Sequence, residues 1–256
     1  MKQSKVLVIG EGFIGKPLTT FLGADTTAKR LNELVAADLN PYDVVINCAA
    51  KTTIDWCEKN REETFDTNVI QAVRLAKLTK GKYVFFSSAC IFKSDSVTDI
   101  NYEDSVPNPQ CFYTYTKLMA EQLIQEVKPD TLIIRPRLII SEKPHPRNTI
   151  NKLLTYDKVL TTQESATVLE DLIPKVAELI ANDEKGPFNT FNAGTISPAE
   201  IMITFRHKHL PITKAILDEV TQGKARRVCT VLGSKRTTAL PHIWSRIEGI
   251  YKNWNK

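Results

Sequence analysis

The sequence predicts an α/β fold with a doubly wound parallel sheet and a smaller C-terminal lobe, and three features support this prediction. Short apolar runs rich in β-branched residues recur through the first 140 residues. Segments with helical character separate these runs, and a glycine-rich turn connects the first run to the first helix. Strands that alternate with helices are typical of parallel sheets covered by helices on both faces.

Each element of the expected sheet has a local basis. Buried parallel strands read as continuous apolar runs, and such runs occupy residues 5–9, 43–47, 82–86 and 131–135. The helices expected between them cover residues 16–21, 55–78 and 113–127. Asp55, with further acidic residues behind it, is a candidate N-cap for the second of these helices. A short second strand should end near Lys29 and Arg30.

The pattern changes after about residue 140, where prolines separate short elements. These prolines are Pro144, Pro146, Pro174, Pro187, Pro198 and Pro211. We therefore expect residues 1–140 to form the α/β domain. Residues 141–256 should form mainly a second lobe, interleaved with that domain.

The composition fits a protein that binds a small anionic ligand. The net charge is +5, but Lys and Arg are scattered along the chain, so we expect no nucleic-acid partner. No apolar run reaches the roughly 18–20 residues of a membrane helix, so we expect no membrane partner. The five cysteines have no spacing typical of a zinc site. We therefore expect reduced thiols, no metal, no targeting segment and a cytoplasmic location.

A dinucleotide-binding motif follows the first apolar run. Gly10, Gly12 and Gly15 match the fingerprint in which glycines permit a tight turn, a close approach to pyrophosphate and helix packing on the strand. Free N–H groups at the start of the next helix would face the phosphates. The strand before the motif and the helix after it are the context that confirms such a match. We expect these glycines, together with Phe13 and Ile14, to bind the cofactor.

The end of the second strand favours NADPH as this cofactor. NAD-specific sites usually have an acidic residue about 20 residues after the glycines, where it binds the ribose 2′-hydroxyl. Here Asp25 comes early, and Lys29 and Arg30 occupy the expected position. Two cations there would bind a 2′-phosphate. Residues 1–140 are therefore predicted to be a Rossmann-type NADP-binding domain.

Tyr113 and Lys117 have the spacing of a hydride-transfer site. Residues four apart share one face of a helix, and a lysine ammonium near a tyrosine can lower the phenol pKa by roughly 1–3 units. Ser88, at the end of an apolar strand, could hydrogen-bond a substrate carbonyl beside Tyr113. Lys117 could also donate to the nicotinamide ribose. Together these residues indicate an enzyme that reduces a carbonyl.

The order of these motifs resembles the extended short-chain dehydrogenases/reductases, in which Ala49 and Ala50 would also contact the cofactor. The chain is more closely similar to the bifunctional UDP-4-keto-6-deoxyglucose 3,5-epimerase/4-reductase (UDP-L-rhamnose synthase) family. The segments that carry this resemblance are residues 54–58, 67–69, 90–92, 112–117, 135–137, 146–148, 150–153, 167–169 and 188–194. The resemblance implies that an NDP-4-keto-6-deoxyhexose is inverted at C3 and C5 and is then reduced at C4 with NADPH.

The resemblance also assigns roles beyond the reducing centre. Cys90 corresponds to the family's epimerisation cysteine and Lys152 to its lysine partner, and a thiol suits proton transfer at neutral pH when a cation is near. Arg147 and Asn148 are candidates for contact with the diphosphate or the sugar. Asn68 is interpreted as structural, binding backbone near the active strand. The C-terminal lobe would hold the nucleotide sugar, and the assembly could be a homodimer.

Two other functions stay open. One is reduction alone, as in dTDP-4-dehydrorhamnose reductases, and Cys90 and Lys152 argue against it. The other is a non-catalytic, nucleotide-binding regulatory subunit, against which the intact Ser88, Tyr113 and Lys117 argue. The segment 233–236 departs from the family's nucleotide-sugar-binding Arg-Ser-Asn-Asn sequence. A 2-acetamido analogue is therefore a further candidate substrate.

Overall fold

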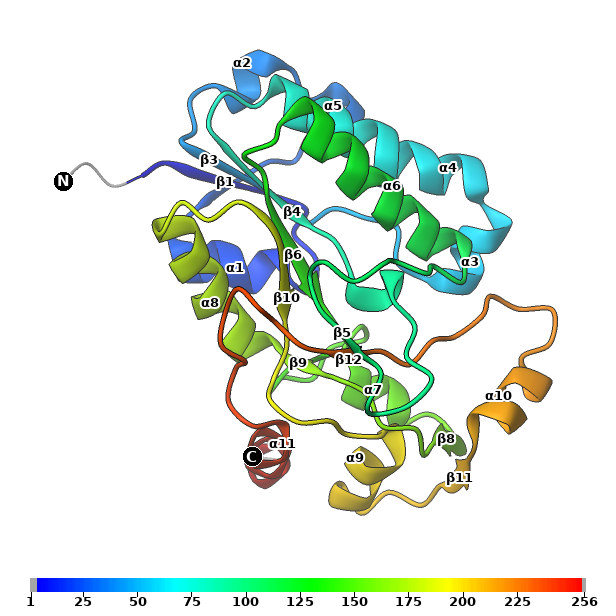
Figure 1. Cartoon of the computed structure of the whole chain (residues 1–256). Helices are drawn as coiled ribbons and strands as arrows, with labels where there is room; N and C mark the ends of the chain where they lie inside the picture. Colours follow the sequence, from blue (N-terminus) through cyan, green and yellow to red (C-terminus); the bar gives the residue numbers. More distant parts are fainter. Residues whose placement is uncertain (1–3, 255–256) are drawn as a thin grey trace.

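A six-stranded sheet, in which every strand pair is parallel, lies at the centre of the protein (Figure 1). The computed structural model describes residues 4–254. The strand order is β10-β6-β4-β3-β1-β2. The strands are β1 (Val6–Ile9), β2 (Asp25–Thr26), β3 (Val44–Asn47), β4 (Lys82–Phe86), β6 (Leu132–Pro136) and β10 (Gly186–Thr190). The predicted α/β fold with a parallel sheet is confirmed.

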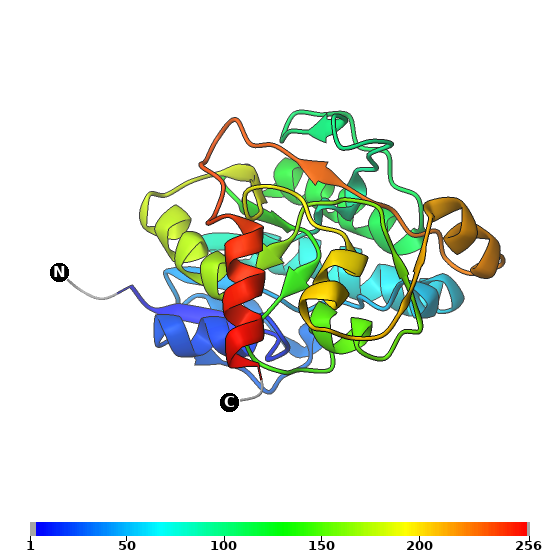
Figure 2. The same ribbon diagram turned by 90° about the horizontal axis from the view of Figure 1, so that it is seen from below.

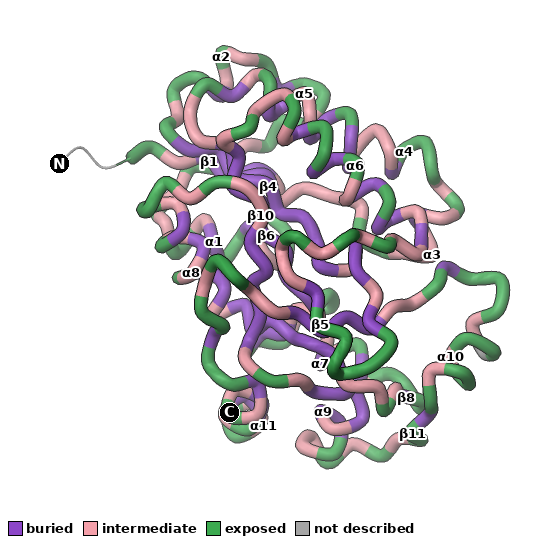
Figure 3. Tube along the Cα trace, in the orientation of Figure 1, coloured by how far each residue is buried: buried purple, intermediate pink, exposed green. Residues whose placement is uncertain are grey.

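Helices cover both faces of this sheet, as its apolar strands require. On one face α1 (Gly15–Leu22) and α8 (Leu169–Ala181) pack through Leu18, Leu172 and Val176 against β1, β3, β4 and β6. On the other face α5 (Gln71–Leu78) and α6 (Phe112–Val127) contribute Leu75 and Ile124 to a second core. Figure 3 shows the buried residues concentrated along the central strands. The sheet is therefore buried between two helical layers.

The helix expected over residues 55–78 is divided into four segments. They are α3 (Ile54–Lys59), α4 (Arg61–Phe65), the π-helical segment η2 (Asp66–Ile70) and α5. The prediction that Asp55 caps this region was wrong, because Thr53 occupies the N-cap position. The Asp55 carboxylate instead accepts two hydrogen bonds from Arg227, at 2.7 and 2.6 Å. A distant cation therefore outweighs the local capping preference.

The second strand is shorter than expected. β2 ends at Thr26, and the chain then leads into α2 (Ala36–Leu39) through the 3₁₀ turn η1 (Leu31–Glu33). The prediction that Lys29 and Arg30 end this strand was wrong, because both residues follow it in the loop. They nonetheless lie just beyond the carboxyl end of β2, which is the edge of the sheet that the glycine-rich turn also borders.

The C-terminal half alternates between a second lobe and the central sheet. The lobe contains β7 (Ile139–Ile140), α7 (Thr149–Leu153), β8 (Lys158–Leu160), β9 (Thr167–Val168), α9 (Pro198–Thr204), β11 (Leu210–Ile212), α10 (Lys214–Val220) and α11 (Ile243–Asn253). Figure 2 shows α11 and α9 on the same side of the molecule, where Ile247 and Met202 belong to one apolar core. In between, α8 and β10 return to the main sheet.

Two further short elements lie near the lobe. β12 (Val231–Leu232) pairs with β5 (Ile100–Asn101), and η3 (Ala89–Ile91) directly follows β4. Within residues 4–254, none of the helices combines the length and apolar character needed to cross a membrane. The same part of the chain holds no group of His, Cys, Asp or Glu side chains suited to a metal ion.

A substitution at Gly15 tests the packing of α1 on the sheet. A Cβ there would lie 1.9 Å from the Gly10 carbonyl oxygen, so Gly15→Ala should lower the free energy of unfolding by at least about 2 kcal/mol. Gly249→Ala is the matched control, because this α11 position has open space. It should raise stability by roughly 0.5–1 kcal/mol. Urea unfolding of both variants measures the contrast, and equal effects would contradict it.

Candidate active site

The glycine-rich turn forms a cradle that side chains would fill. Gly10 has φ +96°, and a Cβ there would lie 2.8 Å from the Ala49 nitrogen. A Cβ at Gly12 would only be in ordinary contact with the Arg147 side chain, whereas at Gly15 the backbone of Gly10 leaves no room for a side chain. The helix α1 begins here without a side-chain cap at Ile14. The Lys16 N–H donates to the Gly12 carbonyl at 3.1 Å and Pro17 has no N–H, so the helix offers the cradle mainly the positive end of its dipole. These features fit the pyrophosphate of a dinucleotide.

A loop from the second lobe lies over this cradle. The His145 ring stacks on Phe13, with ring centroids 4.8 Å apart and planes 15° apart. The Arg147 backbone N–H donates to His145 Nδ1 at 3.0 Å. The Arg147 guanidinium lies 3.8 Å from where a Cβ on Gly12 would be, and within residues 4–254 it forms no ion pair. The predicted substrate residue Arg147 therefore stands beside the phosphate loop, where a phosphate group would meet its charge.

Asn148 has a different position from the one predicted. Its side chain is fully buried; Oδ1 accepts from the Ile150 N–H at 3.2 Å, and Nδ2 donates to the Ser141 and Lys143 carbonyls. Asn148 therefore caps α7 and holds the loop, and the prediction of a substrate contact is corrected. Lys152, on α7, is solvent-exposed as a whole residue. Partial burial of its ammonium, followed by the Arg147 cation, lowers the pKa of Lys152.

Two asparagines hold the chain that follows β3. Asn47 Oδ1 accepts from the Ala49 N–H at 3.0 Å, while Asn47 Nδ2 donates to the Tyr83 hydroxyl at 2.9 Å. Asn68, in the π-helical segment, accepts from the Lys51 N–H at 2.8 Å and donates to the Lys51 carbonyl at 3.0 Å. The structural role predicted for Asn68 is thus seen in these bonds. Ala49 and Ala50 lie between the two anchors, with Ala49 directly against Gly10.

Lys117 is buried at the end of β4. The residue is 1% exposed, and its ammonium donates to the Phe86 carbonyl at 2.6 Å and lies 4.2 Å from the centre of the Phe85 ring. Burial lowers the pKa of Lys117 to about 8, although the Glu121 carboxylate and the Cys48 thiol oppose this change. The cation therefore stays protonated at neutral pH and lies beneath the carboxyl ends of β3 and β4.

Tyr113, one helical turn before Lys117, meets Ser88 and Cys90. Burial raises the pKa of Tyr113 above its usual value, the Cys90 thiol contributes in the same direction, and a hydrogen bond with Ser88 opposes both. Ser88 Oγ also accepts from the Cys90 N–H at 3.2 Å. The prediction of a phenol pKa below its usual value was wrong, because the pKa of Tyr113 is raised and burial is the largest cause. Tyr113 is thus a neutral proton donor at neutral pH.

Sequence reasoning missed the residues around Cys90. Arg137 Nη1 donates to Cys90 Sγ at 2.8 Å, and Arg137 Nη2 is paired with the Glu164 carboxylate. The same Nη2 donates to the Val228 carbonyl. The segment 135–137 is part of the family resemblance and contains Arg137. It was therefore the one sequence signal for a cation near Cys90. Glu164 and Val228 had no signal in the sequence.

The segment 233–236 does not lie at this site. Ser234 Oγ donates to Glu103 Oε1 at 2.5 Å, and the Arg236 guanidinium lies 3.9 Å from the centre of the Phe188 ring. Arg236 also donates to the Pro187 carbonyl, near the amino end of β10. The segment that departs from the family sequence therefore lies near the amino end of β10. Residues 223–227 come nearer the site, since Ala225 packs with Tyr113, Cys111 and Cys57.

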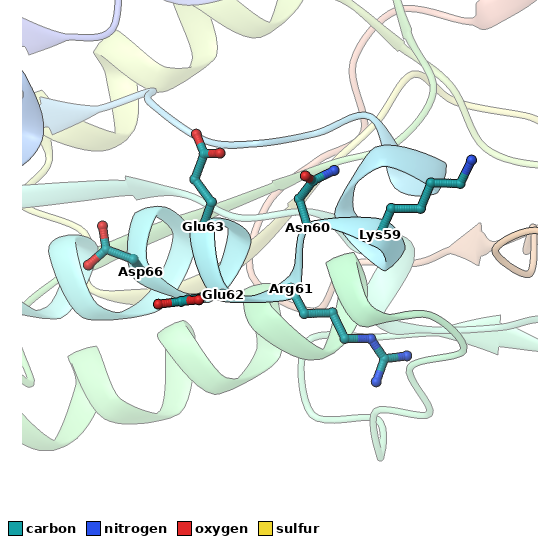
Figure 4. A pocket seen from close by; sticks show the side chains of 6 residues that line it. All are labelled: Lys59, Asn60, Arg61, Glu62, Glu63 and Asp66. Carbon is teal, nitrogen blue, oxygen red and sulfur yellow. The ribbon is translucent and has the colours of Figure 1, made fainter.

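A separate hollow lies on α3 and α4 and contains none of the predicted site residues (Figure 4). Its lining residues are Lys59, Asn60, Arg61, Glu62, Glu63 and Asp66. Figure 4 shows these side chains pointing in different directions rather than toward a common centre. The hollow is therefore a charged helical surface, separate from the cradle and from the ends of β3 and β4.

Fold and site together define an α/β protein of the dinucleotide-binding type, with a tyrosine, a lysine and a serine at the carboxyl edge of its sheet. The chain belongs to the RmlD substrate binding domain family, whose model matches residues 23–182, more than half of its length. An Arabidopsis thaliana bifunctional dTDP-4-dehydrorhamnose 3,5-epimerase/dTDP-4-dehydrorhamnose reductase is 33% identical over 175 residues. That match covers 63% of this chain and 58% of the relative.

Solved structures show the same fold at lower identity. The UDP-rhamnose synthase L780 of Acanthamoeba polyphaga mimivirus superposes with a TM-score of 0.87 at 22% identity, covering 98% of this chain and 99% of that one. A Bacillus anthracis dTDP-4-dehydrorhamnose reductase in complex with NADP gives 0.80 at 20% identity, covering 97% and 99%. The whole chain, including its second lobe, therefore shares this architecture.

The buried cation predicts a pH-dependent stability. Below pH 8 Lys117 is protonated in both folded and unfolded chains, and the folded state bears the full cost of burying it. Between about pH 8 and pH 10.5 the unfolded chain binds the extra proton, so stability attributable to Lys117 should rise with pH. The unfolding free energy of wild type minus that of Lys117→Met should therefore become more positive, by up to about 1.4 kcal/mol per pH unit. Urea unfolding at several pH values measures it, with exposed Lys59→Met as control. A flat or falling difference would contradict the assignment.

Proposed function

We propose that this protein is an NADPH-dependent nucleotide-sugar epimerase/reductase. Its substrate would be an NDP-4-keto-6-deoxyhexose, either UDP-4-keto-6-deoxyglucose or a 2-acetamido analogue, and its product an L-sugar nucleotide such as UDP-L-rhamnose. One observation carries the proposal: Ser88, Tyr113 and Cys90 meet above Lys117 at the sheet edge that the glycine cradle also borders. Family membership and the names of the relatives support the same chemistry.

The reduction follows from the state of two hydroxyl groups. Ser88 and Tyr113, which hydrogen-bond each other, can both donate to the C4 carbonyl oxygen of the sugar. The bound cofactor supplies the hydride. Because burial keeps the Tyr113 phenol protonated, this residue can give its proton to the developing alkoxide. Lys117, one turn along the same helix, then provides a positive charge that favours the resulting phenolate.

Epimerisation uses the same carbonyl in another way. The C4 keto group acidifies the C–H bonds at C3 and C5, and the donors that polarise it for hydride also stabilise the enolate. Cys90 lies beside Tyr113 and is our candidate for the group that takes the proton. Lys152 is the candidate for the acid that returns one to the opposite face. The lowered pKa of Lys152 suits such a donor.

Reduction without epimerisation is the second candidate function. Similarity to solved dTDP-4-dehydrorhamnose reductases favours it, and it would need only Ser88, Tyr113 and Lys117. The contact between Cys90 and Arg137 favours the first candidate, because reduction has no use for a thiol held by a cation. A non-catalytic regulatory subunit would have no need of a buried Lys117, and absence of NADPH turnover would be its signature.

The two proposed activities should separate in two variants. Tyr113→Phe removes the proton donor, so C4 reduction should fall by about 10²–10⁴-fold while NADPH affinity stays nearly unchanged. Cys90→Ser keeps a similar size but ionises far less readily. Solvent deuterium should therefore enter the C3 and C5 positions of UDP-4-keto-6-deoxyglucose much more slowly, as mass spectrometry without NADPH would show.

Each variant serves as the control for the other. Tyr113→Phe should retain deuterium exchange above that of Cys90→Ser, and Cys90→Ser should still reduce a 4-keto sugar that already has the L configuration. If Cys90→Ser exchanges as fast as wild type, epimerisation at this residue is refuted and reduction alone becomes the function. If Tyr113→Phe keeps more than about a tenth of the reduction rate, Tyr113 is not the proton donor.

Cofactor preference should depend on Arg30 more than on Lys29. The Lys29 ammonium is 2.5 Å from the Asp38 carboxylate, whereas the Arg30 guanidinium forms no ion pair within residues 4–254. Arg30→Met should therefore weaken NADPH binding by roughly 10–100-fold, the worth of a charged hydrogen bond, and leave NADH binding unchanged. Lys29→Met should have a smaller effect. Titration calorimetry with both cofactors tests this, and equal affinity of wild type for NADH and NADPH would overturn it.

A further inference from the structure

A buried arginine connects the site cysteine to a buried glutamate. Arg137 follows β6 directly, is 8% exposed, and donates from Nη1 to Cys90 Sγ at 2.8 Å. Its other terminal nitrogen is paired with Glu164, which is 3% exposed. Arg137 Nε is buried without a partner in the structure. One cation therefore serves two groups that can each carry a negative charge.

The backbone around Arg137 is held in an unusual conformation. Leu138 has φ +42°, in the left-handed region that non-glycine residues seldom adopt. The Arg137 N–H donates to Thr167 Oγ1 at 3.0 Å, which fixes the chain where it turns from the sheet into the lobe. Such strain persists only where the surroundings impose it. The contact with Thr167 and the turn at Leu138 therefore fix the direction in which the Arg137 guanidinium points toward Cys90.

We propose that Arg137 and Glu164 together set the charge of Cys90, with Arg137 stabilising the thiolate and Glu164 limiting that stabilisation. This inference rests on the proposed epimerase function, since a group that takes and releases protons must exist in both forms. When Glu164 is ionised, its charge balances that of Arg137, so a thiolate would add uncompensated negative charge in a buried site. The two opposing charges keep the thiol able to change state.

The other titratable groups that interact directly with Cys90, Arg137 or Glu164 are neutral at pH 7, although Glu58 acts on Cys111 and Lys214 acts on Cys229 one contact further out. Tyr113 and Cys111, both on or next to α6, interact with Cys90, and Cys229 interacts with Arg137 and Glu164. Burial raises the pKa of each of these three groups, that of Cys229 to about 11. The charge that acts on Cys90 from this side is therefore that of Arg137, modified by Glu164.

The test follows the pH dependence of Cys90 alkylation by iodoacetamide, read on the Cys90 peptide by mass spectrometry. No cofactor or sugar is added, and Cys90→Ser provides the blank. Arg137→Gln removes the cation and should move the pH midpoint of alkylation upward by about one unit or more. Glu164→Gln keeps the size and removes the opposing charge, so it should move the midpoint downward. Shifts of opposite sign are the expected result.

A merely structural role would give another result. If both variants loosen the site, alkylation should accelerate at every pH with no opposed change in midpoint, and the proposal would be overturned. Arg137→Lys, which keeps the charge, should stay closer to wild type than Arg137→Gln. Should Arg137→Gln fail to fold, an unchanged or raised midpoint in Glu164→Gln alone would refute the proposal.

Deuterium exchange separates this inference from the function on which it rests. Opposed midpoints together with exchange in the wild type that both variants alter would support the inference and the epimerase function. Opposed midpoints without any exchange in the wild type would uphold the charge arrangement and refute epimerisation. Exchange that depends on Cys90 without opposed midpoints would uphold epimerisation and refute the role of Arg137 and Glu164.

Discussion

Buried charge fastens α6 to the central sheet, and the site depends on this attachment. Arg135, on β6, donates to both oxygens of Glu121 at 3.1 and 3.0 Å, and Glu121 is 1% exposed. On the same helix Lys117 donates to the β4 carbonyl of Phe86. A buried charge that loses its partner costs about 3–5 kcal/mol, so neither contact can be released cheaply. The position of Tyr113 relative to Ser88 is therefore fixed before any ligand arrives.

Around the cradle, by contrast, two arginines form no ion pair within residues 4–254. Arg147 lies beside Gly12, and Arg30 follows β2 in the loop beyond its carboxyl end. Anions bound there would meet the positive end of the α1 dipole and positive side chains together. Because Arg147 comes from the second lobe and Gly12 from the first domain, a ligand at the cradle would contact both parts of the chain.

The features that could be predicted from the sequence are local. Apolar runs identify β1, β3, β4 and β6, and the glycine spacing identifies a turn whose close contacts exclude side chains. The four-residue spacing places Tyr113 and Lys117 on one helical face. What failed depends on distant partners: Arg227 draws Asp55 away from capping, and packing raises the pKa of Tyr113. Only the fold brings Arg137 to Cys90 and Glu164 to Arg137.

The place of β10 in the sheet has a consequence for how the chain folds. β10 pairs with β6 in parallel, although the segments β7 to α8 lie between the two strands in sequence. The edge of β6, with Leu132, Ile133 and Ile134, has no strand partner on this side until the intervening segments and β10 have been synthesised. Pairings that close long loops form slowly, and uncovered apolar edges invite aggregation. Nascent chains should therefore be most vulnerable to misassembly in the interval between synthesis of β6 and synthesis of β10.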